Sequence, residues 1–219
     1  MKKFLYNILL TGLLIAELLT GQVASAEEFG HNRVAFSGSL ASWYTYSLEL
    51  SYHYMFFDYV GVGGAVGNWK NWYEDGWASG TGWHIDSDDN EPSNLYLRPS
   101  LVLISPGIKY KDCTWSLFAE PSVMLNIPYQ RVCINLTTNW PLIDYDYTST
   151  NAGQWFAAEL RAGINLRYGP CGISAGYLIS NLNIYSQYRH LYYRGESFRD
   201  FYPNKPLMQG AFLSLSYQF

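Results

Sequence analysis

Four charged residues lie in segments where apolar residues alternate with small or polar ones. They are Glu49, Glu120, Glu159 and Arg161. In each segment every second position is apolar, and the positions between them carry polar or small side chains; we call these two sets the apolar and the polar parity. Each charged residue stands on the polar parity of its segment, eight to ten residues from a short turn. Side chains on a strand alternate between its two faces, so strands set around one axis would bring the four together. Charges held away from bulk water must pair or change their protonation, so this set predicts a buried ion-pair network.

This network contains three carboxylates and one obvious arginine, which leaves a charge deficit. Arg98, Arg167, His53 or protonation of a glutamate would cover that deficit. The chain has eight such alternating segments, and a barrel closed from eight strands has an interior just wide enough for side chains to fill it. We therefore expect a salt-bridged plug centred on Arg161, with a narrow pore as the alternative. The predicted polar network of the lumen is Glu49, His53, Glu120, Glu159 and Arg161.

An acidic stretch in the first half of the chain resembles part of a calcium-binding loop. Asp86, Asp88 and Asn90 have the spacing of its first ligands. Glu91 stands where the loop requires glycine, however, and Leu97 where it requires glutamate. We interpret the stretch as a solvated loop tip and predict no metal site.

The same stretch holds the residue types of a hydrolase triad, namely His84, Asp86 and Ser87. A triad is defined by geometry and roles, and closeness in sequence does not supply that geometry. We predict no catalytic residue and no cofactor. A lipid-modifying enzyme of the acyltransferase or deacylase type is the alternative.

Three cysteines, Cys113, Cys133 and Cys171, form an odd set without zinc-site spacing. Cys113 and Cys171 fall at neighbouring short turns but about two strands apart. Two strand spacings of roughly 4.8 Å exceed the roughly 7 Å that a disulfide tolerates between Cα atoms. We expect free thiols.

The elements that position these residues are predicted from alternation with a period of two. Eight segments show it: 34–41, 46–56, 60–67, 95–103 continuing at 108–110, 115–125, 156–168, 173–180 and 209–219. In each, one parity is continuously apolar or aromatic, and the other carries Ser, Gly, Asn and the charges. A change of apolar parity after Ser105-Pro106 predicts a bulge in the fourth segment. The pattern predicts an all-β, antiparallel, up-and-down transmembrane barrel of eight strands.

The chain ends on the hydrophobic strand 209–219. Its outward parity includes Leu215, Tyr217 and Phe219. A membrane barrel must pair its last strand with its first, because the bilayer leaves no partner for an open edge. We therefore expect these three residues to lie on the lipid-facing side of the closing strand.

The N-terminus has the features of a secretory signal peptide. Lys2 and Lys3 precede an apolar run, and Ala24-Ser25-Ala26 supplies small residues for cleavage after Ala26. We therefore expect residues 1–26 to be the signal peptide and 27–219 to be the barrel domain.

The composition agrees with an exported membrane barrel. Aromatic residues make up 18% of the chain and charged residues only 15%, and the formal net charge is −4. A barrel with aromatic girdles has such a composition, whereas a nucleic-acid-binding protein carries a basic surface. We expect no nucleic-acid partner.

The connections alternate in length after the first. Short turns follow the second, fourth and sixth strands, while Trp69–Asn94, Pro128–Gly153 and Asn181–Leu207 are long. Outer-membrane barrels have short periplasmic turns and long external loops. We expect the three long segments to be external, and an extra hairpin within them would give ten strands.

The terminal aromatic strand and the eight alternating segments resemble the OmpX/OmpA-type outer-membrane barrels. The unit from Leu95-Tyr-Leu-Arg-Pro-Ser-Leu to Phe118-Ala-Glu-Pro-Ser-Val resembles the OmpX-like family common in Bacteroidota. The resemblance covers residues 33–219. It implies residence in the cell outer membrane and contact with outer-membrane lipid and lipopolysaccharide. It also implies insertion by the barrel-assembly machinery, with Leu215, Tyr217 and Phe219 as the barrel-assembly signal.

The expected function is structural or surface-binding, without catalysis. Segment 69–94 carries one lysine against six carboxylates, and segment 181–207 four basic residues against two acidic ones. These loops would either pack on each other or bind glycan, lipopolysaccharide or protein through aromatic side chains. The candidate surface aromatics are Trp72, Trp77, Tyr188, Tyr192 and Tyr193.

Overall fold

The computed structural model describes the backbone of residues 30–71, 78–137 and 143–219, and their side chains except 86–93, 137 and 143. The expected signal peptide, 1–26, and the candidate aromatics Trp72 and Trp77 lie outside the described residues.

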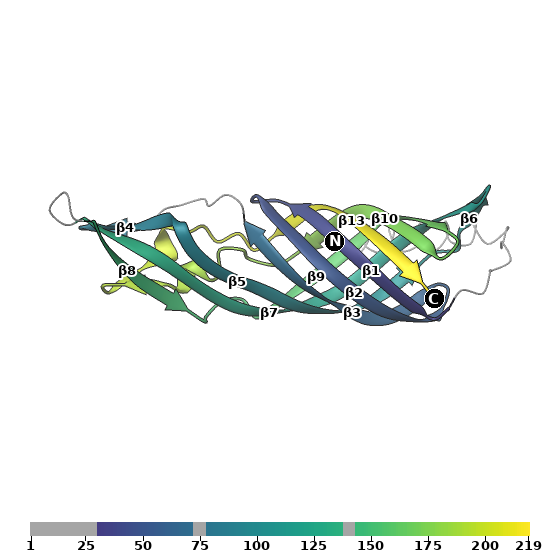
Figure 1. Cartoon of the computed structure of the whole chain (residues 1–219), viewed down its shortest axis with the longest axis horizontal. Coiled ribbons are helices and arrows are strands. Elements are labelled where there is room, and N and C mark those ends of the chain that lie inside the picture. Colours follow the sequence, from purple (N-terminus) through teal and green to yellow (C-terminus); the bar gives the residue numbers. More distant parts are fainter. Residues whose placement is uncertain (1–29, 72–77, 138–142) are drawn as a thin grey trace, which may run out of the picture.

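Eight antiparallel strands close into a barrel (Figure 1). They are β1 (Asn32–Ala41), β2 (Thr45–Phe57), β3 (Val60–Asn71), β5 (Trp83–Ile104), β7 (Cys113–Thr137), β9 (Phe156–Tyr168), β10 (Cys171–Ser180) and β13 (Met208–Gln218). Each pairs with its sequence neighbour, and β1 pairs with β13, so no edge remains. The eight-stranded antiparallel barrel is thereby confirmed.

The remaining elements are short. They are β4 (Ser79–Gly80), β6 (Ile108–Tyr110), β8 (Ile143–Thr150), β11 (Tyr192–Tyr193), β12 (Glu196–Ser197) and two 3-10 turns, Tyr188–His190 and Phe198–Asp200. β6 continues the course of β5 after an interruption at residues 105–107 and pairs with the start of β7. Here the exposed parity changes as the sequence predicts, with Ile108 and Tyr110 facing outward. None of the helical segments in the described chain is long or apolar enough to cross a membrane.

Two strands are much longer than the sequence predicts. β5 begins at Trp83, not near residue 95, and β7 continues to Thr137. Their pairing runs out to Trp83 opposite Leu136, and β8 adds to the free side of β7. Strand structure therefore replaces loop over much of 69–94 and 128–153. The alternative of an extra hairpin within these segments is met by the β4–β5 and β7–β8 pairs, although β4 and β8 stay outside the eight-stranded ring. Backbone hydrogen bonds extend a hairpin without requiring apolar side chains, so weak alternation concealed it.

The extended parts of β5 and β7, together with β4 and β8, project from one end of the barrel (Figure 1). We call this four-stranded extension the outer sheet. The opposite end carries the β2–β3, β6–β7 and β9–β10 turns, and we call it the turn end. Far from being a separate domain, the outer sheet shares its two longest strands with the barrel wall.

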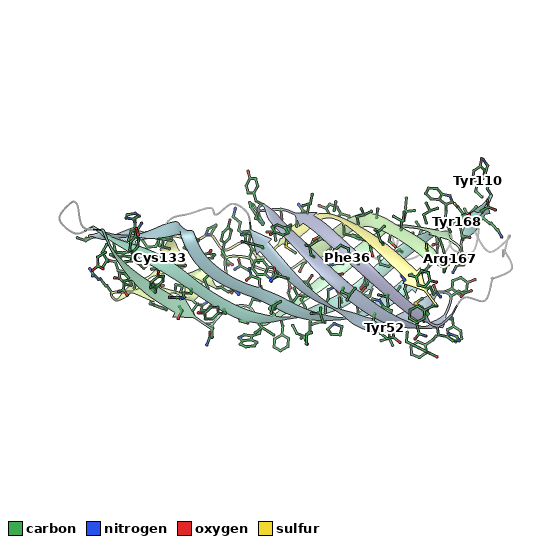
Figure 2. All side chains as sticks on the ribbon, viewed as in Figure 1. Phe36, Tyr52, Tyr110, Cys133, Arg167 and Tyr168 are labelled. Atoms are coloured by element: carbon green, nitrogen blue, oxygen red, sulfur yellow. The ribbon has the colours of Figure 1, made fainter. Side chains whose placement is uncertain are left out.

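The barrel wall follows the predicted alternation. Phe36 and Tyr52 are 54% and 49% exposed on the outside (Figure 2). Their neighbours Ser37 and Ser51 are buried inside. The same division holds along β9, where Leu160 and Ile164 face outward and Arg161 and Asn165 inward.

Two glycines allow the wall to curve tightly. Gly163 on β9 and Gly176 on β10 pair directly across the strands. A Cβ at either position would overlap the backbone of the facing strand. Glycine is required here because only its bare backbone permits so close an approach.

Candidate functional site in the lumen and the outer sheet

The centre of the lumen holds a cluster of two arginines and three glutamates. Arg98 donates to both oxygens of Glu49 at 2.7 and 3.1 Å and lies 2.8 Å from Glu120. Arg161 donates to Glu159 at 2.8 Å and to Glu49 from both terminal nitrogens, one bond being 3.0 Å. All five side chains are at most 7% exposed. Paired and hydrogen-bonded in this way, the charges offset much of the cost of their burial.

Glu49 is the shared carboxylate of this cluster. Besides both guanidinium groups, the Tyr96 hydroxyl donates to it at 3.0 Å. Fork-like contacts from planar guanidinium groups fix the carboxylate in position as well as neutralising it. We call Glu49, Arg98, Glu120, Glu159 and Arg161 the charged plug.

His53 lies at the edge of the plug. Its Nε2 is 2.7 Å from the Ser100 hydroxyl and 3.5 Å from Glu120. Two guanidinium groups leave one of the three carboxylates without a countercharge. His53 and Ser100 therefore place polar atoms beside Glu120, the carboxylate that His53 faces.

An aromatic pair closes the lumen below the plug. The rings of Phe118 and Phe212 lie 5.9 Å apart. Arg161 lies 5.7 Å from the Phe212 ring centre, and Arg33, on the turn-end side, 5.8 Å from that of Phe118. Both phenylalanines stand on the inward parity. The ion pairs and the two rings therefore stand next to each other inside the barrel, whose interior is about wide enough for side chains to fill.

The structure brings together all five lumen residues named from the sequence. It differs from the expectation in its centre, because Arg98 contacts Glu49, Glu120 and Glu159 and is as central as Arg161. The sequence offers Arg98 only as one of several ways to cover the deficit, and it predicts no role for Tyr96 or Arg33. All three stand on the inward parity of their strands, which was the available signal.

The apolar cluster of the barrel interior continues under the outer sheet. The segment 181–207 folds over one face and packs on Ile85, Val132 and Ile134. Trp83 stacks on Phe198 with ring centres 5.5 Å apart and meets the edge of Tyr193 at 5.2 Å. These contacts convert the longest predicted loop into a packed layer.

Hydrogen bonds hold this covering layer in place. Arg189 donates to the Tyr202 and Arg199 carbonyls at 2.6 and 2.9 Å. The Tyr193 hydroxyl donates to Asp146 of β8 at 2.9 Å. Burial raises the pKa of Tyr193, and the hydrogen bond to Asp146 raises it further, so the phenol remains a donor.

Two candidate surface aromatics are therefore buried. Tyr188 is 6% and Tyr193 7% exposed, because both point into the core under the outer sheet. A surface ligand cannot reach them, so the prediction that Tyr188 and Tyr193 are surface aromatics is wrong. Tyr192 is exposed, as are two aromatics on β8 that the sequence pattern does not single out, Tyr145 and Tyr147.

The remaining candidates from the sequence are placed as follows. The side chains of Asp86, Ser87, Asp88 and Asn90 lie outside the described residues. His84 is exposed, 3.4 Å from the Asn135 amide. Cys113, Cys133 and Cys171 are free thiols in the structure. Cys113 and Cys171 flank Tyr168 from opposite sides, two strands apart.

Comparison with known proteins gives structural neighbours only. No protein-family model and no curated protein matches the chain. Solved structures with a similar course include Neisserial surface protein A, at 11% identity and TM-score 0.43, over 88% of this chain and all of that one. The N-terminal β-barrel domain of Pseudomonas aeruginosa OprF has 10% identity and TM-score 0.39 over the same shares. Ail, the attachment invasion locus protein of Yersinia pestis, has 11% identity and TM-score 0.38 over the same shares.

Proposed function

We propose that the chain is an integral outer-membrane β-barrel protein that displays the outer sheet for contacts at the cell surface. The observation that carries this proposal is the belt of exposed apolar side chains around the closed barrel. Phe36, Leu48, Val66, Leu160 and Leu215, from five strands, are each 44–58% exposed. The largest apolar patch on a soluble monomer covers about 300–600 Å², and a belt encircling a barrel exceeds that. Such a belt is stable when it faces the hydrocarbon core of a lipid bilayer.

The closure of the barrel supports the same proposal. Phe219 and Asn32 exchange backbone hydrogen bonds of 2.8 and 2.9 Å, so the last residue completes the ring. Its side chain and Tyr217 are exposed on the belt. Recognition of Leu215, Tyr217 and Phe219 by the barrel-assembly machinery, and membership of the OmpX-like family, are parts of this proposal.

The surface for contacts is the exposed aromatic strip of β8. Tyr145 and Tyr147 stand on one parity, and Arg131 of β7 stacks 4.2 Å from the Tyr147 ring centre. Flat rings with polar edges suit the faces of sugar rings, and the neighbouring arginine suits anionic groups. The proposed ligand class is therefore glycan, including the sugar portion of lipopolysaccharide.

The orientation is tested by tags at the two ends of the molecule. A tag after Gly195, in the β11–β12 turn, is expected to bind antibody on intact cells. The matched tag between Lys111 and Asp112, in the β6–β7 turn, is expected to bind only after permeabilisation, because turns of such barrels are periplasmic. Both proteins should stay in the outer-membrane fraction and change gel mobility on heating. Labelling of only the Lys111 tag on intact cells would reverse the orientation.

The proposed binding surface is tested with a glycan array. Replacing both Tyr145 and Tyr147 with alanine is expected to lower binding of the folded barrel at least about tenfold, the scale of two lost aromatic contacts. The control replaces Tyr110 and Tyr168, which are aromatics at the turn end and are even more exposed than Tyr145 and Tyr147. If the Tyr145/Tyr147 double variant binds a glycan as strongly as the Tyr110/Tyr168 control does, the β8 strip is not the glycan-binding surface.

A further inference from the structure

A cavity of about 360 Å³ opens at the turn end of the barrel, below the Phe118–Phe212 pair. Arg33, Lys109 and Arg167 line it together with Asp58 and Asp112. Figure 2 shows Arg167 at this end, close to the outward-pointing Tyr168. The volume is within the range of small-molecule sites, roughly 300–1,000 Å³. None of the sequence patterns assigned a role to this end of the lumen.

Arg33 is the unexplained group in this cavity. It is only 5% exposed, and its contacts are two long hydrogen bonds of 3.4 Å to the hydroxyls of Ser174 and Ser216, besides the Phe118 ring. In the described part of the chain no carboxylate forms an ion pair with Arg33. Glu120, the nearby acid, is held by Arg98 on the other side of the rings. A buried guanidinium with five donors and so few acceptors is expected to have an anionic partner.

The charge balance of the cavity indicates which anion fits. Three cationic side chains and two carboxylates line the cavity, so it presents charges of both signs. A ligand with one carboxylate and one ammonium group can pair with both signs, whereas a phosphate dianion would bring two negative charges toward Asp58 and Asp112. The guanidinium fork matches a carboxylate with two parallel hydrogen bonds.

The two acids add a second requirement. Asp58 and Asp112 lie on the β2–β3 and β6–β7 turns, at the rim and away from the buried floor formed by Arg33. Acids at the rim would attract the ammonium group of a ligand whose carboxylate lies deeper. We propose that the cavity binds a small peptide-like zwitterion, with its carboxylate on Arg33 and its ammonium group at Asp58 and Asp112. This inference is independent of the proposed surface binding, which concerns the opposite end of the molecule.

The test uses the folded barrel in detergent micelles and isothermal titration calorimetry. Dialanine is the probe, and N-acetyl-dialanine, dialanine amide and inorganic phosphate are the comparison ligands. Dialanine is expected to bind, the acetylated form more weakly because it lacks the ammonium group, and the amide not measurably because it lacks the carboxylate. Tighter binding of phosphate than of dialanine, or no binding of any carboxylate, would overturn the proposal.

Variants locate the site. Arg33→Gln is expected to weaken dialanine binding at least about tenfold, the scale of one lost charge-assisted hydrogen bond. Arg33→Lys keeps the positive charge but loses the forked pair of donors, so its affinity for dialanine should lie between those of the wild type and Arg33→Gln. Arg194→Gln, at an exposed loop position, is the control and should bind as wild type. If Arg33→Gln does not fold, the dialanine affinities of Arg33→Lys and Arg167→Gln test the site instead. An affinity equal to that of the wild type in both variants would refute the site.

Discussion

Replacing Arg161 with leucine is expected to lower the free energy of unfolding by about 3–5 kcal/mol, the usual cost of removing one partner from a buried ion pair. Arg161 is 2% exposed, and its loss would leave Glu159 with only the 3.8 Å contact to Arg98. Glu49 would keep Arg98 and Tyr96. The measurement is urea unfolding in micelles, followed by circular dichroism.

The control for this experiment is Arg194→Leu, which removes the same charge from an exposed turn. Its midpoint should stay near that of the wild type, since exposed charges contribute little to stability. A double variant, Arg161→Met with Glu159→Met, should lose less than the two single variants added together, because both members of the pair are removed. Equal stability of Arg161→Leu and Arg194→Leu would contradict a stabilising plug.

The plug also predicts electrical behaviour. The wild-type barrel should give no steady single-channel current in planar bilayers, because ion pairs and the Phe118–Phe212 rings fill the lumen. A stable wild-type conductance would favour the narrow pore instead.

Replacing Trp83 with alanine should disrupt the outer sheet while leaving the barrel folded. Trp83 is 3% exposed and packs against both Phe198 and Tyr193. Truncating a large buried aromatic side chain costs about 3–5 kcal/mol. The covering segment 181–207 should therefore open locally, and its amides should exchange with deuterium faster than in the wild type.

Trp155→Ala is the matched control, because Trp155 is 50% exposed just before β9. In this control the amides of segment 181–207 should exchange with deuterium at the wild-type rate. Both variants should keep the heat-dependent gel mobility of a folded barrel. Loss of the barrel itself in Trp83→Ala would mean that barrel and outer sheet fold as one unit.

The sequence alone determined which face each strand residue occupies. Side chains alternate with a period of two, so apolar parity predicts the outside and polar parity the inside wherever pairing is regular. Glu49, Glu120, Glu159, Arg161 and His53 could be selected as lumen residues for this reason. Their common depth followed from counting residues from the short turns.

The tertiary structure decided the partners and the outer sheet. Which inward residues meet depends on strand stagger and tilt, so Arg98 became a second centre of the plug and Arg33 was left facing a cavity. Trp83 and Tyr193 pack together although 110 positions separate them in the chain. Such long-range packing leaves no local period, because the apolar residues of segment 181–207 meet the outer sheet from an irregular chain. Parity is a local property of the backbone, whereas contact across a barrel or between two layers is set by the closure of the whole fold.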